Sequence, residues 1–244
     1  MNEALYPILA TVAVSLVSLV GVVTLMISDK ILNKILLLLV ALSAGVLMGG
    51  AFLHLIPEAF EEYGPGSVSI WILVGFSVFF VLERLLHWHH CHKHGGKCEV
   101  HTFTYMNLVG DGLHNFVDGL LIAASFSMDF SLGMATTVAV IAHEIPQEIG
   151  DFAVLLHGGF SKGKALLMNF LSALVAVAGA VVGVLLVSEV EDFTKVLIPL
   201  TAGGFIYIAA SDLIPELHKQ PKLSSSILSF AVFILGIVFM FLLV

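Results

Sequence analysis

The sequence predicts an all-α membrane protein, and three observations support this prediction. Of its 244 residues, 59% are hydrophobic and only 11% are charged. The mean hydropathy is +1.05, and the apolar residues gather in long runs. Because an ordinary soluble domain carries about 25% charged residues, a soluble fold of this length could not bury so much apolar surface. A soluble enzyme, a nucleic-acid-binding protein and a disordered chain are therefore excluded.

Eight apolar stretches are each long enough to cross a bilayer, which takes roughly 20 residues. They cover residues 4–27, 34–57, 67–87, 102–126, 132–157, 163–187, 194–217 and 224–244. Since they occupy most of the chain, we expect a single transmembrane domain over residues 1–244. The lipid bilayer is then its surroundings, and we expect a multi-pass protein of the cell membrane, plasma or inner.

The positive charges predict how the spans are oriented. Nine of the 10 Lys and Arg residues lie beside connections that alternate spans place on one side: Lys30, Lys34, Arg84, Lys93, Lys97, Lys162, Lys164, Lys219 and Lys222. Lys195 alone falls on the other side. Because cytoplasmic connections carry an excess of Lys and Arg, we expect that side to be cytoplasmic and both termini to lie outside.

Spans two and seven share a short repeated word. Residues 54–58 read His-Leu-Ile-Pro-Glu, and residues 212–216 read Asp-Leu-Ile-Pro-Glu. The two spans run in opposite directions, as in an inverted repeat of alternating-access transporters. We therefore expect a 3+2+3 bundle, with the alternative that short apolar words match by chance. Its parts would be a first three-helix repeat (1–87), a His-rich cytoplasmic loop (88–101), a central helix pair (102–157) and a second repeat (163–244).

The central pair of spans carries the chemical signal. Seven ionisable residues lie in the middle of two helices: Asp111, His114, Asp118, His143, Glu144, Glu148 and Asp151. Each costs several kcal/mol at this depth unless it is paired, hydrated or bound to metal. Imidazole with carboxylate suits Zn²⁺, and also Fe²⁺, Mn²⁺ or Cd²⁺. Asn115 and Gln147 add amide oxygens. A proton relay without metal and an inert structural role remain as alternatives.

The connection between spans three and four is rich in histidine. Residues 87–101 contain six of the 11 His and both Cys. Tracts of this kind bind metal, and the glycines among them favour mobility. We expect His89, His90, His92 and His94 to accept or sense metal in the cytoplasm, with an ordered structural zinc site as the alternative.

The motifs 114-HNxxDG-119 and 143-HExPQExGD-151 resemble the paired signatures of the ZIP (Zrt/Irt-like) family of divalent-metal transporters. The resemblance implies a 3+2+3 bundle, zinc uptake toward the cytoplasm and a binuclear central site. It implies a main site of His114, Asp118, His143 and Gln147, a second site at Asn115, Glu144 and Glu148, and mouth positions at His54 and Asp212. The chain departs from the branch signature at Gln147, where that signature has His. It also has Asn169 where other branches place a carboxylate.

We therefore expect a transporter and not an enzyme, with the metal as cargo and no cofactor. Asp212 and Glu216 would receive the ion on the inner side. An intramembrane zinc hydrolase is one competing function, because 143-HExxQ-147 resembles H-E-x-x-H, although Gln147 breaks that pattern. A metal exporter is another, since the residues alone do not fix direction. Runs of small residues in span six would allow close packing within the bundle or in a homodimer. No nucleic-acid partner is expected.

Overall fold

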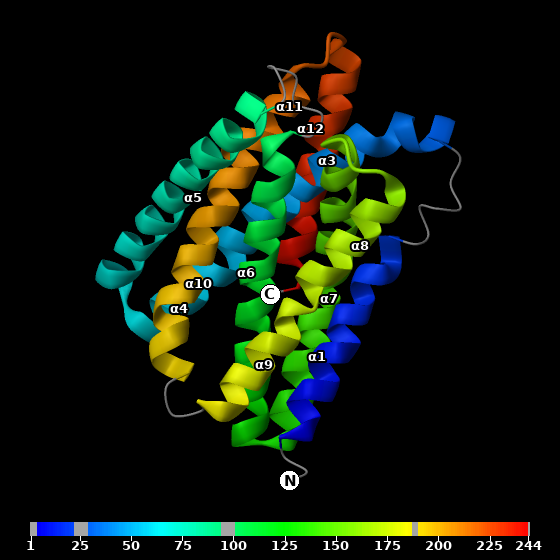
Figure 1. Ribbon diagram of the computed structural model, residues 1–244. Coiled ribbons are helices and arrows are strands. Elements are labelled where there is room, and N and C mark those ends of the chain that lie inside the picture. The colour runs from blue at the N-terminus through cyan, green and yellow to red at the C-terminus, as the bar shows by residue number, and fades with distance from the viewer. Residues whose placement is uncertain (1–3, 22–28, 94–100, 187–189, 244) are drawn as a thin grey trace.

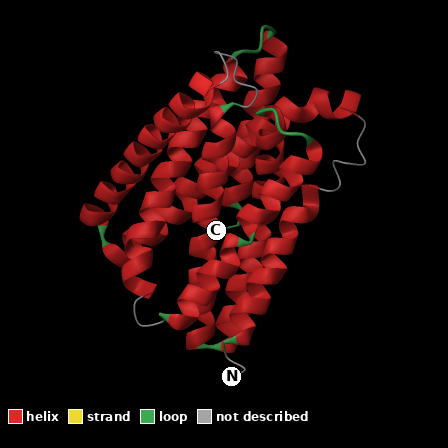
Figure 2. Ribbon diagram, in the orientation of Figure 1, coloured by secondary structure: helices red, strands yellow, loops and turns green. Residues whose placement is uncertain are grey.

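The computed structural model describes residues 4–21, 29–93, 101–186 and 190–243. In these segments the chain forms helices joined by short loops, and no strand occurs among them (Figure 2). Five helical stretches are long and apolar enough to cross a membrane, namely 35–61, 65–85, 162–185, 193–218 and 223–241. The prediction of an all-α, multi-pass membrane protein is confirmed at this level.

The predicted spans correspond to helices with shifted ends. They are α1 (Leu5–Val17) with η1 (Ser18–Gly21), α3 (Asp29–Gly49) with η2 (Gly50–Leu55) and α4 (Ile56–Tyr63), α5 (Pro65–Lys93), α6 (Thr102–Met128), α7 (Phe130–His157), α8 (Lys162–Ala173) with α9 (Val175–Leu185), α10 (Val190–Tyr207) with η3 (Ile208–Leu213) and α11 (Ile214–His218), and α12 (Leu223–Phe241). The second span is longer than predicted because Pro57 occupies the first turn of a new helix, where its missing N–H costs nothing. The third continues to Lys93 instead of ending at residue 87, so the first part of the expected loop 88–101 is helical.

A π-helix forms at both copies of the repeated Leu-Ile-Pro-Glu sequence. A six-residue π-helix covers Gly50–Leu55, and another covers Ile208–Leu213. Each is followed by an α-helix with proline in its first turn. A proline leaves a carbonyl one turn earlier without its usual donor, and π-turns of this kind occur frequently at functional sites. The repeat in sequence is therefore also a repeat in local structure.

Glycines bring three pairs of helices into close contact. A Cβ atom on Gly45 of α3 would lie 2.1 Å from the carbonyl oxygen of Phe233 in α12. Gly203 of α10 approaches Ile72 of α5 in the same way, and Gly179 of α9 approaches Phe116 of α6, each at 2.1 Å. In Figure 1, α5 and α10 run side by side on one flank, and α6 and α7 lie in the middle of the bundle. Of these three crossings, that of α9 with α6 involves the central pair, and the other two join α3 to α12 and α5 to α10.

The ends of the helices form two faces of the bundle. The junctions of α5 with α6, of α7 with α8 and of α11 with α12 lie at one end, which is the upper end in Figure 1. The His101 N–H donates to the Gly158 carbonyl over 2.9 Å and joins two of these junctions. Lys195 lies toward the opposite end, 5.5 Å from the centre of the Tyr63 ring. The division of cationic residues between the two sides of a membrane stays a prediction.

Candidate metal centre

Four side chains from α6 and α7 converge at the centre of the bundle: His114, Asp118, His143 and Glu144. Their four ligand atoms lie within 4.8 Å of one another. Helical spacing puts His114 and Asp118 on one face of α6, and their Nε2 and Oδ2 atoms are 3.5 Å apart. His114, Asp118 and Glu144 are buried, and the His143 side chain is 16% exposed. Among the described residues this is the one group of three or more such side chains that could hold a metal ion.

The spacing of these atoms fits a tetrahedral ion. The two Nε2 atoms, of His114 and His143, are 3.2 Å apart, and His143 Nε2 lies 3.3 Å from Asp118 Oδ2. Glu144 Oε1 lies 3.4 Å from His114 Nε2 and 3.8 Å from His143 Nε2. With zinc bonds of about 2.0–2.2 Å, a regular tetrahedron separates its ligand atoms by about 3.3–3.6 Å. A single Zn²⁺ could therefore contact all four atoms with small side-chain adjustments.

A chamber of about 210 Å³ opens onto three of these residues, His114, Asp118 and His143. Its wall includes His54 and Glu58 from the first repeated word, together with Gln147 and Phe205. The His54 Nε2–H donates to the Met240 carbonyl over 2.9 Å, and its ring centre lies 6.3 Å from that of His143. The first repeated word thus borders the same chamber as His114, Asp118 and His143.

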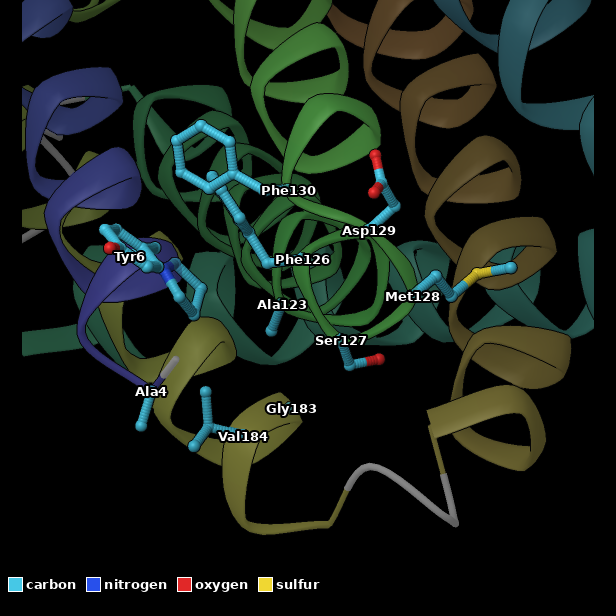
Figure 3. A pocket seen from close by; sticks show the side chains of 11 residues that line it. Ala4, Tyr6, Ala123, Phe126, Ser127, Met128, Asp129, Phe130, Gly183 and Val184 are labelled. Atoms are coloured by element: carbon cyan, nitrogen blue, oxygen red, sulfur yellow. The ribbon is translucent and has the colours of Figure 1, made fainter. Parts of the chain in front are cut away.

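A larger cavity lies elsewhere and lacks ligand chemistry. It has a volume of about 690 Å³ and is formed by the beginning of α1, the α6–α7 junction and the end of α9 (Figure 3). Aromatic side chains of Tyr6, Phe126 and Phe130 gather there, and Asp129 is the one ionisable carboxylate in its wall. Donor chemistry thus distinguishes the group between α6 and α7 from this cavity, which volume alone does not.

The remaining polar residues of the central pair form a second layer. Gln147 borders the chamber and donates to Asp111 Oδ1 over 3.4 Å. Asn115 also donates to Asp111 Oδ1, over 2.9 Å. Asn169 donates to Glu148, and Asn107 donates to Asp151 Oδ1 over 3.1 Å. The Glu144 carboxylate thus lies beside the two histidines, whereas the Gln147 side-chain amide donates to Asp111.

The second repeated word lies apart from this chamber. Asp212 is buried with its Oδ2 atom lacking a hydrogen-bond partner, and the carboxylates of Glu83 and Glu216 are its charged neighbours. Glu216 contacts Lys219, and its Oε2 lies 3.4 Å from His157 Nε2. Among the loop histidines, residues 89, 90 and 92 lie on the helical backbone of α5, but their side chains are outside the described part. His94 lies outside the described residues altogether.

Sequence reasoning missed three of these neighbours. Asn107 lies one turn before Asp111, so helical spacing could have found it. Glu83 and His157 are separated from the repeated word by more than 50 residues of chain, and no local pattern connects them to it. Only the fold brings them to Asp212 and Glu216.

Comparison with known proteins decides the family. The profile of the ZIP zinc transporter family matches residues 4–102 and 87–244. The chain belongs to this family. The zinc transporter zipt-7.1 of Caenorhabditis briggsae is 33% identical over 243 residues, covering 75% of the chain and 62% of that protein. Zinc transporter ZIP13 of Pongo abelii is also 33% identical, over 217 residues, covering 83% of the chain and 65% of that protein.

A shorter match with a higher identity adds to this result. Zinc transporter ZIP10 of Danio rerio is 42% identical over 134 residues, which are 52% of this ZIP-family chain and 16% of the ZIP10 protein. The chain thus spans somewhat less than two thirds of the length of the first two relatives. Family membership is consistent with a transporter and with the metal as the transported substrate.

Proposed function

We propose that this protein carries divalent transition-metal ions, zinc foremost, across a cell membrane toward the cytoplasm. The single observation that carries the proposal is the group of His114, Asp118, His143 and Glu144, whose ligand atoms lie within 4.8 Å of one another between two buried helices. Mixed imidazole and carboxylate ligands bind zinc without the thiolates of a permanent site. Such ligation suits an ion that must leave as well as enter.

The proposed arrangement in the membrane follows from the fold. The eight predicted spans would form a 3+2+3 inverted repeat, with 102–157 as the central pair between repeats 1–87 and 163–244. Both termini would lie outside, since alternate spans place nine of the 10 Lys and Arg residues beside connections on the other side. The ion would enter past His54, bind the central group and leave past Asp212 and Glu216. The segment 88–101 would accept it in the cytoplasm.

The other residues that the sequence singles out would act around this group. Gln147 lines the chamber, so its amide oxygen could contact a passing ion. Asn115, Glu148, Asp111 and Asp151 would form the second layer beneath it. A homodimer would use the outer faces of the bundle, because α5 and α12 leave most of their surfaces uncovered.

The test is zinc uptake into sealed proteoliposomes that contain a zinc-sensitive dye. We expect His143→Ala to lower the initial rate at least tenfold, because it removes one imidazole from the group. His218→Ala, a histidine exposed on α11, is the matched control and should transport like the wild type. Equal uptake by both variants, with equal amounts of inserted protein, would refute the site assignment. Peptide cleavage by the detergent-solubilised protein without uptake would favour the hydrolase alternative.

A further inference from the structure

Span six, formed by α8 and α9, is broken where the two helices meet. α8 ends at Ala173 and α9 begins at Val175, with Leu174 between them. The Val177 N–H donates to the Leu174 carbonyl over 3.1 Å, whereas in a continuous α-helix it would donate to Ala173. Residues 170–177 contain neither proline nor glycine, so the local sequence does not explain the break. A helix is also bent where a side chain inserts into its backbone hydrogen bonds.

The inserted side chain is that of Ser15 in α1. Its Oγ atom lies 2.8 Å from the Ala173 carbonyl oxygen and 2.9 Å from the carbonyl oxygen of Thr11 on its own helix. Ser15 is buried, and a backbone carbonyl without a donor is costly inside a membrane. The Ser15 hydroxyl therefore supplies the donor that Val177 does not. Ser18 offers a contrast, because its buried hydroxyl donates within the same segment, to the Ser15 carbonyl over 2.8 Å.

α1 is itself fixed on the central pair. It packs against α7 and α9, and Figure 1 shows it alongside α7. Val14, the residue before Ser15, forms a buried cluster with Ile122 of α6 and Val140 of α7. Two consecutive residues of α1 thus contact the central pair and the break in span six, which relates the position of one to that of the other.

The last turn of α8 brings two polar side chains to the central pair. Asn169, one turn before the break, is fully buried, and its Nδ2 atom donates to the Glu148 carboxylate. Ser172, at the break, donates its hydroxyl to the Leu108 carbonyl of α6 over 3.1 Å. Glu148 follows Glu144 of the four-atom group by one helical turn. The angle at the break therefore decides where these two donors meet α6 and α7.

We propose that Ser15 is a positioning residue of the metal centre, and that it acts through the break in span six. Its hydroxyl stabilises the break, and the break keeps Asn169 in contact with Glu148. Glu148 is then held one turn away from the two histidines, which leaves the place beside them to Glu144. As a contribution to ion binding, this role rests on the proposed function.

The test is zinc uptake into proteoliposomes over a range of zinc concentrations. We expect Ser15→Ala to raise the KM about fivefold with little change in the maximal rate, because the ion site is distorted while the bundle stays intact. Ser15→Thr keeps the hydroxyl and should transport like the wild type. Ser18→Ala removes a second buried hydroxyl from the same segment. It is the matched control and should also leave the KM unchanged.

A double-mutant cycle separates positioning from a general loss of stability. In the Asn169→Ala background, Ser15→Ala should raise the KM no further, because the proposed effect passes through Asn169. Hydrogen exchange of the detergent-solubilised protein, followed by mass spectrometry, adds a measurement without transport. Ser15→Ala should speed the exchange of backbone amides in residues 169–177, and Ser18→Ala should not.

Three results would overturn the proposal. The first is an unchanged KM in Ser15→Ala, the second is an effect of Ser15→Ala that persists in the Asn169→Ala background, and the third is unchanged exchange in residues 169–177. If Ser15→Ala does not fold, Ser15→Cys replaces it, because a thiol is a weaker donor than a hydroxyl. Absence of zinc uptake by the wild type would count against the proposed function, and the exchange measurement would then decide the role of Ser15.

Discussion

The two copies of the Leu-Ile-Pro-Glu word share a backbone but not their surroundings. Each follows a six-residue π-helix and has proline in the first turn of the next helix. His54, before the first copy, lines the chamber of the central group and donates to the Met240 carbonyl. Asp212, before the second, is buried beside two further carboxylates, Glu83 and Glu216. The repeat thus supplies two similar π-helices. His54 gives the first an imidazole, and Asp212 gives the second a carboxylate.

This difference suggests distinct roles for the two ends of a transport path. An imidazole open to the chamber can select the ion and pass it to other imidazoles. A cluster of carboxylates outside the chamber can attract the ion by charge after it has left. Four variants test this comparison, and they are given in order of decreasing expected effect.

The largest effect is expected from Gly45→Leu, which affects the first copy alone. Its side chain would collide with the Phe233 backbone at the crossing of α3 and α12, the two helices that bring His54 to Met240. We expect a loss of about 3 kcal/mol or more in the free energy of unfolding, because backbone cannot move aside cheaply. Thermal unfolding in detergent measures it. Gly66→Leu, which has open space around its Cβ position, is the control, and equal stability of the two variants would contradict the close crossing.

His54→Ala should weaken capture of the ion. We expect the KM for zinc to rise about tenfold with little change in the maximal rate, which corresponds to about 1.4 kcal/mol of lost binding. Initial uptake rates over a range of zinc concentrations measure both quantities. A lower maximal rate at unchanged KM would contradict the role of His54 in entry.

Asp212→Asn should affect the later part of the cycle. We expect the maximal uptake rate to fall about threefold with the KM unchanged, because only release loses a charged group. The same uptake series as for His54→Ala measures it, with equal protein incorporation checked by immunoblot. If Asp212→Asn instead raised the KM like His54→Ala, the two copies would have the same role and the comparison would fail.

The smallest effect is expected from His157→Ala. Its Nε2 atom lies 3.4 Å from Glu216 Oε2, and both side chains retain some contact with solvent. A partly exposed pair of this kind contributes about 0.5 kcal/mol, so we expect the melting temperature to fall by about 2 °C or less. A much larger fall would show that the contact between α7 and α11 is a main support of the second copy.

Much of the fold could be predicted from the sequence because its signals are local. Apolar runs indicate helices, and spacing of three or four residues places His114 with Asp118 on one face. Local spacing does not predict whether Glu144 or Gln147 lies beside the two histidines. Both follow His143 on α7, and the rotation of that helix about its axis decides which one faces α6. Neighbouring helices set this rotation, so spacing within one helix cannot.

The π-helices and the approach of Glu83 to Asp212 could not be predicted from the sequence, for related reasons. Pro57 and Pro215 predict freed carbonyls, but the widened turn that forms around them depends on the packing of the helices on either side. Glu83, Asp212 and Glu216 come from three different elements. Their meeting is a consequence of tertiary structure, which a repeat in one chain segment does not contain.

The ionisable residues of α6 and α7 have a consequence for how the chain enters its membrane. Neither α6 nor α7 is among the helices apolar enough to cross by composition, although they contain 27 and 28 residues. An aspartate at the middle of a helix opposes insertion by about 2.5–3.5 kcal/mol. Together they carry Asp111, Asp118, Glu144, Glu148 and Asp151. We expect the translocon to release them into lipid together, shielded by helices already inserted. The residues proposed to bind the ion would then also constrain the order in which the helices insert.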